Sequence, residues 1–316
     1  MYCYGARLDE QQVAFSYENF VSNGLVSVLD IDQAELDKLP DRFLKGKFNL
    51  SKLKVQNNDP VDPAWLTWCR ALYARFRPEL DGVDNPKFVD PFRFISLLSD
   101  HAQPTDILAM GSSGTAPNTF LQAFKIKRGQ RFVNAGTMGL MGADIPMAIG
   151  ACLAGGNRTL CATGDGGFML NVQELEVIRR LNLPIKFFVY NNNGYASIRN
   201  MQNARFGGFH VACDRDSGLT LPRIADRGTD YGGLADAFGI QSSVAYTAAD
   251  VELFLNSPYF TGSSPFILEL MIDPKYEQFP KVVNRMVNNE FIKTPMQEMT
   301  PPIPDLDELM KWGNDD

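Results

Sequence analysis

The stretch Thr159–Arg199, TLCATGDGGFMLNVQELEVIRRLNLPIKFFVYNNNGYASIR, decides the fold of this 316-residue chain. It contains two apolar runs that predict buried strands, separated by residues at helical spacing. The first strand ends at a Gly-Asp-Gly turn around Asp165, and the second ends at an Asn-rich turn around Asn192. Because the strands of a right-handed β-α-β unit run parallel, we expect Asp165 and Asn192 at the same edge of a sheet.

That edge predicts a site for a phosphate and a divalent cation. Open α/β sheets bind ligands outside the carboxyl ends of their strands. A carboxylate, a side-chain amide and a backbone carbonyl are hard oxygen ligands, and they suit Mg²⁺ together with phosphate oxygens and water. Glycines beside Asp165 let backbone N–H groups approach a phosphate, and the following helix offers its positive N-terminus. Each turn alone is common in proteins without ligands, so the prediction depends on their combination.

The rest of the chain repeats the alternation of apolar strands and helices. Strands that are buried on both faces and separated by helices predict a parallel, doubly wound α/β sheet. The predicted strands are Leu25–Asp32, Asp106–Met110, Arg158–Thr163, Ile185–Tyr190, Gln241–Tyr246 and Pro265–Ile272. The predicted helices are Gln33–Leu39, Pro63–Phe76, Phe92–Leu98, Asp144–Ala154, Val172–Leu181, Gly233–Phe238 and Ala249–Leu255.

Composition excludes several functional classes. The formal net charge of −7 argues against a nucleic-acid partner, because binding phosphates needs a basic face. No apolar run is long enough to span a bilayer, and the N-terminus lacks the apolar core of a signal peptide. The five cysteines form no CxxC pair, which suits a reducing cytoplasm. Only two histidines occur, which argues against a histidine-rich zinc site and a Ser-His-Asp triad.

The Gly-Asp-Gly turn, followed at this distance by the Asn-rich turn, resembles the thiamine diphosphate (ThDP) motif of acetolactate synthase and its relatives. The residues around the motif are similar to those of the large, catalytic subunit of acetolactate synthase. The resemblance implies that Asp165, Asn192 and the carbonyl of Gly194 bind Mg²⁺. It also implies that the glycines beside Asp165 lie against the diphosphate; these are Gly164, Gly166 and Gly167.

Two further segments resemble cofactor-side parts of the same family. In Ala135–Ala151, AGTMGLMGADIPMAIGA, the carbonyl of Gly136 would accept from the 4′-amino group of the cofactor. Met138 would face the pyrimidine with its N–H and hold the cofactor in a bent shape with its side chain; otherwise it is a core methionine. The loop Gly111–Thr115, GSSGT, matches a third cofactor-side loop, which implies that Ser112 and Ser113 bind the cofactor.

The resemblance covers nearly the whole chain but only the C-terminal part of a family protein. Residues 1–50 resemble the end of the family's central α/β domain, and residues 51–90 are expected to be a linker with a helix. Residues 91–290 are the expected ThDP diphosphate- and Mg²⁺-binding domain, and residues 291–316 an acidic, Pro-rich tail. Because the family's central domain binds most of the FAD that many members carry, we do not expect FAD here.

The family's activating group is not expected in this sequence. In family members a glutamate of a separate pyrimidine domain protonates the cofactor ring. No residue of this chain is therefore predicted to be catalytic, and Glu174 is interpreted as a packing residue. We expect a pyrimidine domain from a partner chain, from another copy in a homo-oligomer or from a missing N-terminal part, and negligible turnover without it. Both a split subunit and a truncated reading frame fit this expectation.

The resemblance implies a transferase or lyase that decarboxylates or joins 2-keto acids such as pyruvate. The tryptophan that selects the second substrate in acetolactate synthases is replaced here by Met201, and Ser197 and Ile198 lie on the substrate side. Arg199 is interpreted either as a partner of a substrate carboxylate or, more commonly for such a residue, as a solvated surface residue. Two alternatives remain: a relative that uses another 2-keto acid, and a non-catalytic or vestigial ThDP-binding module. A dinucleotide-binding domain is disfavoured because no G-x-G-x-x-G follows a strand.

Overall fold

The computed structural model describes most of the chain. The described residues are 1–9, 12–13, 16–21, 24–49, 62–76, 85–111, 114–134, 139–219, 221, 230–277, 281–283, 285–287, 290–292, 294, 298–303 and 305. Contacts divide the chain into two units. The larger is Phe76–Glu277, and the smaller combines Met1–Arg75 with Gln278–Asp316. The smaller unit therefore contains residues from both ends of the chain, and the predicted domain boundaries stay predictions.

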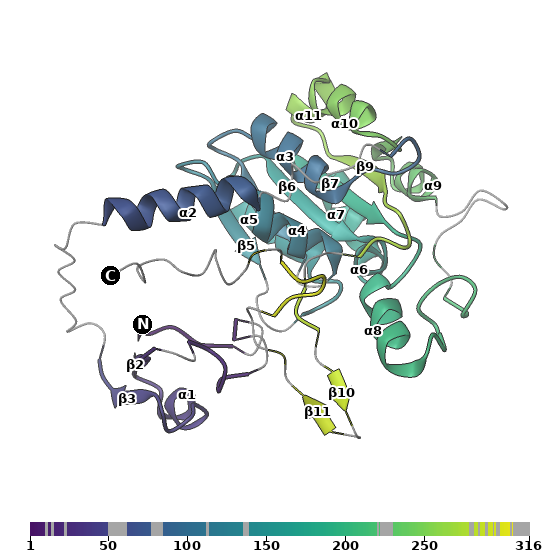
Figure 1. Cartoon of the computed structure of the whole chain (residues 1–316). Coiled ribbons are helices and arrows are strands. Elements are labelled where there is room, and N and C mark those ends of the chain that lie inside the picture. Colours follow the sequence, from purple (N-terminus) through teal and green to yellow (C-terminus); the bar gives the residue numbers. More distant parts are fainter. Residues whose placement is uncertain are drawn as a thin grey trace. The chain divides into compact units, whose positions relative to one another are not determined.

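The larger unit is built on a six-stranded sheet in the order β5-β4-β6-β7-β9-β8. All neighbouring strands in it run parallel (Figure 1). Its strands are β4 Ile107–Met110, β5 Arg131–Asn134, β6 Thr159–Gly164, β7 Ile185–Asn191, β8 Gln241–Ala245 and β9 Phe266–Met271.

The strands at the centre of this sheet are buried on both faces. Every residue of β7 is buried, and so are the first five residues of β6 and of β9. A strand of this kind needs apolar helices on both sides. Alternate residues of β7 accordingly enter two different cores, with Phe188 and Tyr190 in one and Phe187 and Val189 in the other. The prediction of an α/β fold with a parallel sheet is confirmed.

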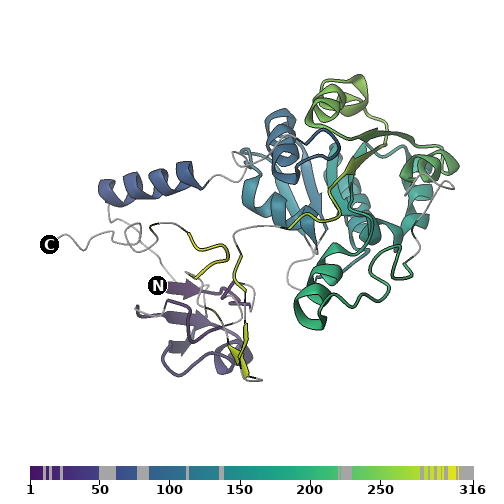
Figure 2. The same ribbon diagram turned by 45° about the vertical axis from the view of Figure 1, so that its right-hand side comes forward.

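Helices supply the other half of each core (Figure 2). Side chains of α3, α4 and α10 belong to the core that contains Phe188, and those of α5, α7 and α9 belong to the core that contains Phe187. None of the helices that the structure describes has the length and apolar character needed to cross a membrane. The helices of the larger unit are α3 Pro91–His101, α4 Thr115–Ala123, α5 Asp144–Gly155, α6 Asp165–Met169, the 3₁₀ helix η4 Val172–Glu174, α7 Leu175–Leu181, α8 Ala196–Phe206, α9 Tyr231–Ala237, α10 Ala248–Leu255 and α11 Pro258–Thr261.

The register of β6 and β7 brings the two polar turns together. Gly164, the last residue of β6, lies opposite Tyr190 near the end of β7. Asp165 and Asn192 therefore leave the sheet at the same carboxyl edge, as the β-α-β pattern predicts.

Several elements were not expected from the sequence. The strand β5 has no fully buried residue, so it lacks the apolar run that marks the other strands. The helix α8 is mostly polar, with only Ala196 and Arg199 buried. The segment predicted as one helix over Val172–Leu181 begins with a 3₁₀ turn instead.

The smaller unit contains a parallel sheet in the order β1-β2-β3. A small core that includes Val26, Val28, Leu36 and Phe43 packs beside it. Within residues 1–50 the sequence predicted one strand and one helix; the structure adds β1, which contributes Cys3 to this core, and β3, which pairs with β2. The elements of this unit are β1 Tyr2–Tyr4, β2 Ser27–Asp30, α1 Gln33–Asp37, β3 Leu44–Lys47, α2 Pro63–Arg75, β10 Arg285–Val287 and β11 Glu290–Ile292; β10 and β11 pair antiparallel.

A buried ion pair at the opposite end of the sheet tests the fold. Arg158 donates to both carboxylate oxygens of Asp106 at 2.8 and 2.7 Å and to the carbonyl of Phe260 at 2.9 Å. Asp106 is 2% exposed, so Arg158→Ala leaves a buried charge without its partner. We expect the free energy of unfolding, measured with urea, to fall by about 3–5 kcal/mol.

Arg180→Ala is the matched control, since it removes a solvent-exposed ion pair with Glu176 within α7. We expect this change to alter stability by less than about 0.5 kcal/mol. Equal effects of the two substitutions would show that burial of the Asp106 pair has no energetic importance.

Candidate functional site

The carboxylate of Asp165 links the two turns at the sheet edge. It lies at the start of α6, and the residue is 2% exposed. One oxygen accepts from the backbone N–H of Gly166 at 2.7 Å, and the other accepts from that of Gly194 at 2.8 Å. The main-chain carbonyl of Asp165 accepts from the hydroxyl of Tyr231 at 2.8 Å. The side chain thus belongs to both turns at once.

Burial makes this carboxylate unusually basic. Loss of hydration raises the pKa of Asp165 to about 7, although backbone N–H donors and the charge of Arg199 oppose the shift. A cation next to the carboxylate would favour its ionised form. The Asp165 carboxylate is therefore suited to bind a metal ion in its ionised form.

Asn192 presents a buried acceptor beside Asp165. The residue is 6% exposed, and its side-chain oxygen has no hydrogen-bond partner. A buried polar atom without a partner is destabilising by about 1–3 kcal/mol, so it needs a reason to persist. An oxygen kept available for a bound cation is such a reason. The donor set therefore fits Mg²⁺.

Glycines allow other parts of the chain to pack closely against the two turns. Gly194 adopts φ +135°, and a Cβ there would lie 2.4 Å from the carbonyl oxygen of Cys213. A Cβ on Gly166 would lie 2.0 Å from the ring of Tyr195. The absence of a side chain at both positions therefore permits the observed packing of the turns.

A cavity of about 190 Å³ lies between these turns. Its walls come from the starts of α4, α5, α6 and α8, all at the carboxyl edge of the sheet. The lining includes every described residue predicted to bind cofactor or metal, together with Ser197 and Ile198 on the predicted substrate side. These predicted residues are Gly164, Asp165, Gly166, Gly167, Asn192 and Gly194.

Asp144 also lines the cavity, although its place in the sequence did not predict this. This side chain is buried, and one of its oxygens accepts from the hydroxyl of Thr163 while the other has no hydrogen-bond partner. Burial raises the pKa of Asp144 to about 6, and the Thr163 bond partly opposes this. An acidic residue at the start of a helix is common, so little in the sequence indicates that this one faces a cavity.

A third buried carboxylate, that of Glu269 on β9, is connected to the site through hydrogen bonds. It accepts from the side-chain N–H of Asn191 at 2.5 Å and from the backbone N–H of Tyr231. Asn191 in turn accepts from the backbone N–H of Asn193 at 3.1 Å, and Tyr231 bonds Asp165. Glu269 is thereby connected to both polar turns. In the sequence, Glu269 stands out only as a charged residue inside an apolar strand, which is the one feature that could have indicated its role.

Other predicted residues have different outcomes. Ser112, Ser113, Gly136 and Met138 lie outside the described residues, so their roles stay predictions. In the part of the chain that is described, Met201 does not line the cavity.

The interpretation of Arg199 as a solvated surface residue is wrong. Arg199 is 8% exposed and donates to the carbonyls of Asn192 and Pro274. It also lies 3.9 Å from the carboxylate of Asp214. Through the bond to Asn192, the Arg199 side chain binds the backbone of the Asn-rich turn.

Comparison with known proteins places this site in a family. Residues 112–257 match the family "Thiamine pyrophosphate enzyme, C-terminal TPP binding domain". This part of the chain is similar to the C-terminal domain of thiamine pyrophosphate enzymes. Thiamine pyrophosphate (TPP) is another name for ThDP, and the match contains both polar turns.

Acetolactate synthase large subunits are distant homologues of the chain. The chain is 28% identical to the large subunit of acetolactate synthase isozyme 2 from Escherichia coli (strain K12), over 92% of this chain and 50% of that protein. It is 24% identical to the isozyme 1 large subunit from the same organism, over 91% of this chain and 50% of that protein. The chain therefore spans about half the length of these relatives.

A solved structure shares the fold of this thiamine pyrophosphate enzyme domain. The thiamine diphosphate-dependent 4-hydroxybenzoylformate decarboxylase of Rhodococcus jostii RHA1 superposes with a TM-score of 0.60 at 18% identity. The superposition covers 79% of this chain and 44% of the decarboxylase chain.

The connection of Glu269 to both turns predicts a pH dependence of stability. Burial raises its pKa in the folded chain from 4.5 to about 7. Between these values the folded state holds the proton that the unfolded state has lost, so this contribution to stability is lost as the pH rises. Glu269→Gln cannot titrate, and it should remove up to about 3 kcal/mol of the loss between pH 4.5 and pH 8.

The measurement is urea unfolding of the metal-free chain at several pH values. Asp165 and Asp144 titrate in the same direction, so the variant should retain part of the slope. Glu176→Gln on the exposed face of α7 is the control and should leave the pH profile unchanged. A Glu269→Gln profile that matches the parent would show that titration of Glu269 does not contribute to the pH dependence of stability.

Proposed function

We propose that this chain is the ThDP- and Mg²⁺-binding half of a 2-keto acid decarboxylase or carboligase that resembles acetolactate synthase. The observation that supports this most is the buried, unpartnered side-chain oxygen of Asn192 next to the carboxylate of Asp165. Both lie in the region that matches the thiamine pyrophosphate enzyme family.

The proposed Mg²⁺ ligands are Asp165, Asn192 and the carbonyl of Gly194. Each carboxylate oxygen of Asp165 uses one lone pair for a backbone N–H and retains another for the ion. The cation would offset the charge of a diphosphate, whose oxygens complete the octahedron. Gly164, Gly166 and Gly167 would let the diphosphate approach the backbone at the start of α6.

When bound, ThDP supplies a carbanion-forming carbon that attacks the ketone of a 2-keto acid. The chain's own residues would position the cofactor. Gly136, Met138, Ser112 and Ser113 are the proposed contacts on its other parts. The activating glutamate is proposed to come from a pyrimidine domain outside these residues, carried by a partner chain, a second copy or another segment.

The exposure of apolar residues at the cavity supports a covering domain. Met141 and Ile198 line the cavity and are 38% and 40% exposed. Apolar side chains of this size at a ligand site are suited to contact with another protein surface. The substrate is proposed to be a 2-keto acid such as pyruvate, and Ser197 and Ile198 are proposed to contact it.

The proposed cation site makes binding dependent on metal and on pH. We expect ThDP binding, measured by calorimetry on the purified chain, to require Mg²⁺ and to weaken at least about tenfold in Asp165→Asn and Asn192→Ala, since each loses a ligand or charge. Because the ionised form of Asp165 is the ligand, Mg²⁺ affinity should fall by up to about tenfold per pH unit below about 7.

Asp236→Asn, an exposed carboxylate of α9, is the matched control and should bind as the parent does. Binding of ThDP that ignores both Mg²⁺ and the Asp165 substitution would overturn the proposed ligand set.

The division of labour between domains is tested by deuterium exchange at C2 of ThDP, followed by acid quench and NMR. With this chain and Mg²⁺ alone we expect no acceleration over solvent, because the proposed activating glutamate lies elsewhere. Addition of a pyrimidine-domain chain should restore rapid exchange. Rapid exchange with this chain alone would show that it holds its own activating acid. Tight ThDP binding without exchange in any combination would instead support a non-catalytic module.

A further inference from the structure

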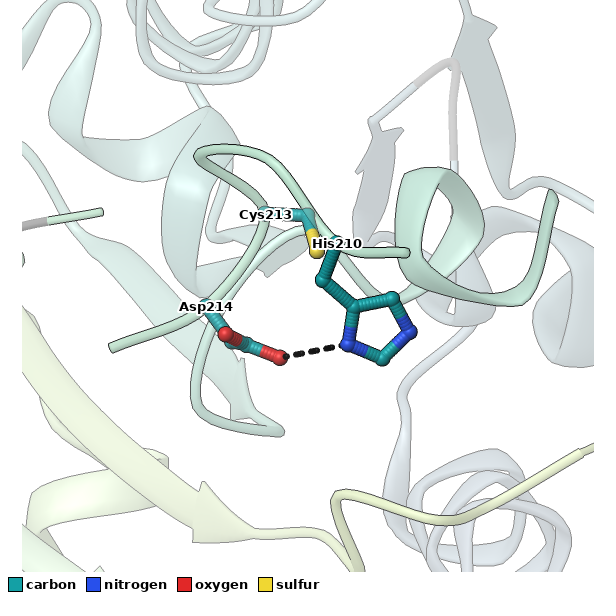
Figure 3. A group of neighbouring side chains, drawn as sticks. All are labelled: His210, Cys213 and Asp214. Atoms are coloured by element: carbon teal, nitrogen blue, oxygen red, sulfur yellow. Dashed lines mark ion pairs between the residues drawn. The ribbon is translucent and has the colours of Figure 1, made fainter. Parts of the chain in front are cut away.

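Three side chains with metal-binding atoms meet in the loop after α8. They are His210, Cys213 and Asp214, and their ligand atoms all lie within 4.8 Å of one another (Figure 3). Cys213 is buried, whereas His210 and Asp214 are partly exposed. An ion could therefore enter from the solvent side and meet a thiol at the protected end.

The imidazole of His210 is oriented by a neighbour. Its Nε2 lies 2.7 Å from the side-chain oxygen of Asn203. An amide oxygen only accepts hydrogen bonds, so Nε2 donates to it and Nδ1 is the ring nitrogen left to bind an ion. That Nδ1 lies 3.7 Å from Oδ2 of Asp214. A cation between these two atoms would be attracted by both.

The carboxylate of Asp214 is also fixed in place. Its Oδ1 accepts from the backbone N–H of Ser217 at 3.0 Å and from the Ser217 hydroxyl at 2.7 Å. Its Oδ2 lies 3.7 Å from Nδ1 of His210 and 3.9 Å from the guanidinium of Arg199. The same hydroxyl lies 3.5 Å from the sulfur of Cys213, so Ser217 orders two of the three groups. Outer contacts of this kind hold metal ligands in place in proteins.

We propose that His210 Nδ1, Cys213 Sγ and Asp214 Oδ2 bind a Zn²⁺ ion, with water in the fourth position. Zn²⁺ accepts nitrogen, sulfur and oxygen ligands in a tetrahedron, whereas Mg²⁺ prefers oxygen alone. Tetrahedral bonds of about 2.0 Å place nitrogen and oxygen ligands about 3.3 Å apart, so the observed 3.7 Å needs a shift of only a few tenths of an ångström. The Cys213 thiol loses its proton to solvent on binding, and thiolate and carboxylate balance the charge of the ion.

This site is distinct from the proposed Mg²⁺ site and does not depend on it, but the two share a backbone connection. The carbonyl of Cys213 accepts from the N–H of Tyr195 at 2.7 Å, and Gly194 pairs with Asp214 in an isolated β-bridge. An ion bound by the loop would therefore stiffen the strand segment that carries Gly194. Occupancy of the Zn²⁺ site is expected to raise the thermal unfolding midpoint of the chain.

Cobalt substitution tests the proposal, because Co²⁺ bound to a thiolate absorbs in the near ultraviolet and tetrahedral Co²⁺ absorbs in the visible. The full-length chain, first freed of metal with a chelator, is titrated with Co²⁺ in a large excess of Mg²⁺. We expect one Co²⁺ per chain with both absorptions, displaced by one equivalent of Zn²⁺. The excess of Mg²⁺ keeps Co²⁺ out of the proposed Mg²⁺ site, and Asp236→Asn, an exposed carboxylate of α9, should leave this titration unchanged.

Variants assign the ligands. Cys213→Ser should abolish the near-ultraviolet band, and His210→Gln should weaken Co²⁺ binding at least about tenfold. Asn203→Ala keeps all three ligands and should weaken binding by about 10- to 100-fold through the lost support of His210. Cys69→Ser on α2 is the matched control and should behave as the parent.

Clear outcomes would overturn the proposal. The first is a parent chain that shows no thiolate band with Co²⁺, which would leave a protonated His210 paired with Asp214 as the reason for the cluster. The second is a band that survives Cys213→Ser or disappears in Cys69→Ser. If Cys213→Ser does not fold, the partly exposed His210→Gln and Asn203→Ala decide the question, and parent-like affinity in both would exclude the site.

Discussion

The two hydrogen bonds that the Asp165 carboxylate accepts, from Gly166 and Gly194, are the constraint on which the site depends. They tie together the turns that end β6 and β7. The carboxylate has been removed from water to make them, which raises its pKa to about 7. A residue held in this way is not optimal for stability of the ligand-free domain. Its position is better explained by a ligand that the domain binds.

The sheet supports this constraint through residues far away in the sequence. Glu269 reaches Asn191 from the neighbouring strand, and Tyr231 reaches the main chain of Asp165 from α9. Arg199 holds the carbonyl of Asn192. Three elements that follow the motif therefore fix the geometry of the motif.

The loop that carries His210 packs directly against this arrangement. The bridge between Gly194 and Asp214 connects the loop to one of the proposed Mg²⁺ ligands. The neighbouring Arg199 lies between the two regions, 3.9 Å from Asp214 and bonded to the Asn-rich turn. This loop belongs to the same structural unit as the sheet.

The sequence by itself determined the α/β class, the central strands and the meeting of Asp165 with Asn192. It could do so because strands buried on both faces leave long apolar runs, and because parallel strands joined by one helix have only one common handedness. It did not indicate β5 or α8, whose residues are too polar or too exposed to show a period. The smaller unit's extra strands were missed for a similar reason, since each is only three or four residues long.

Only the tertiary structure decided which polar residues surround the motif. Asp144 and Glu269 lie far apart in sequence from Thr163 and Asn191, which they contact, and a single acidic side chain has no period that a sequence pattern can reveal. Arg199 was misjudged because a charged residue on a polar helix is normally solvated, whereas here backbone carbonyls and a carboxylate replace the water. The period of the buried apolar residues can be read from the sequence. Isolated polar groups, by contrast, form pairs only after distant segments have packed together.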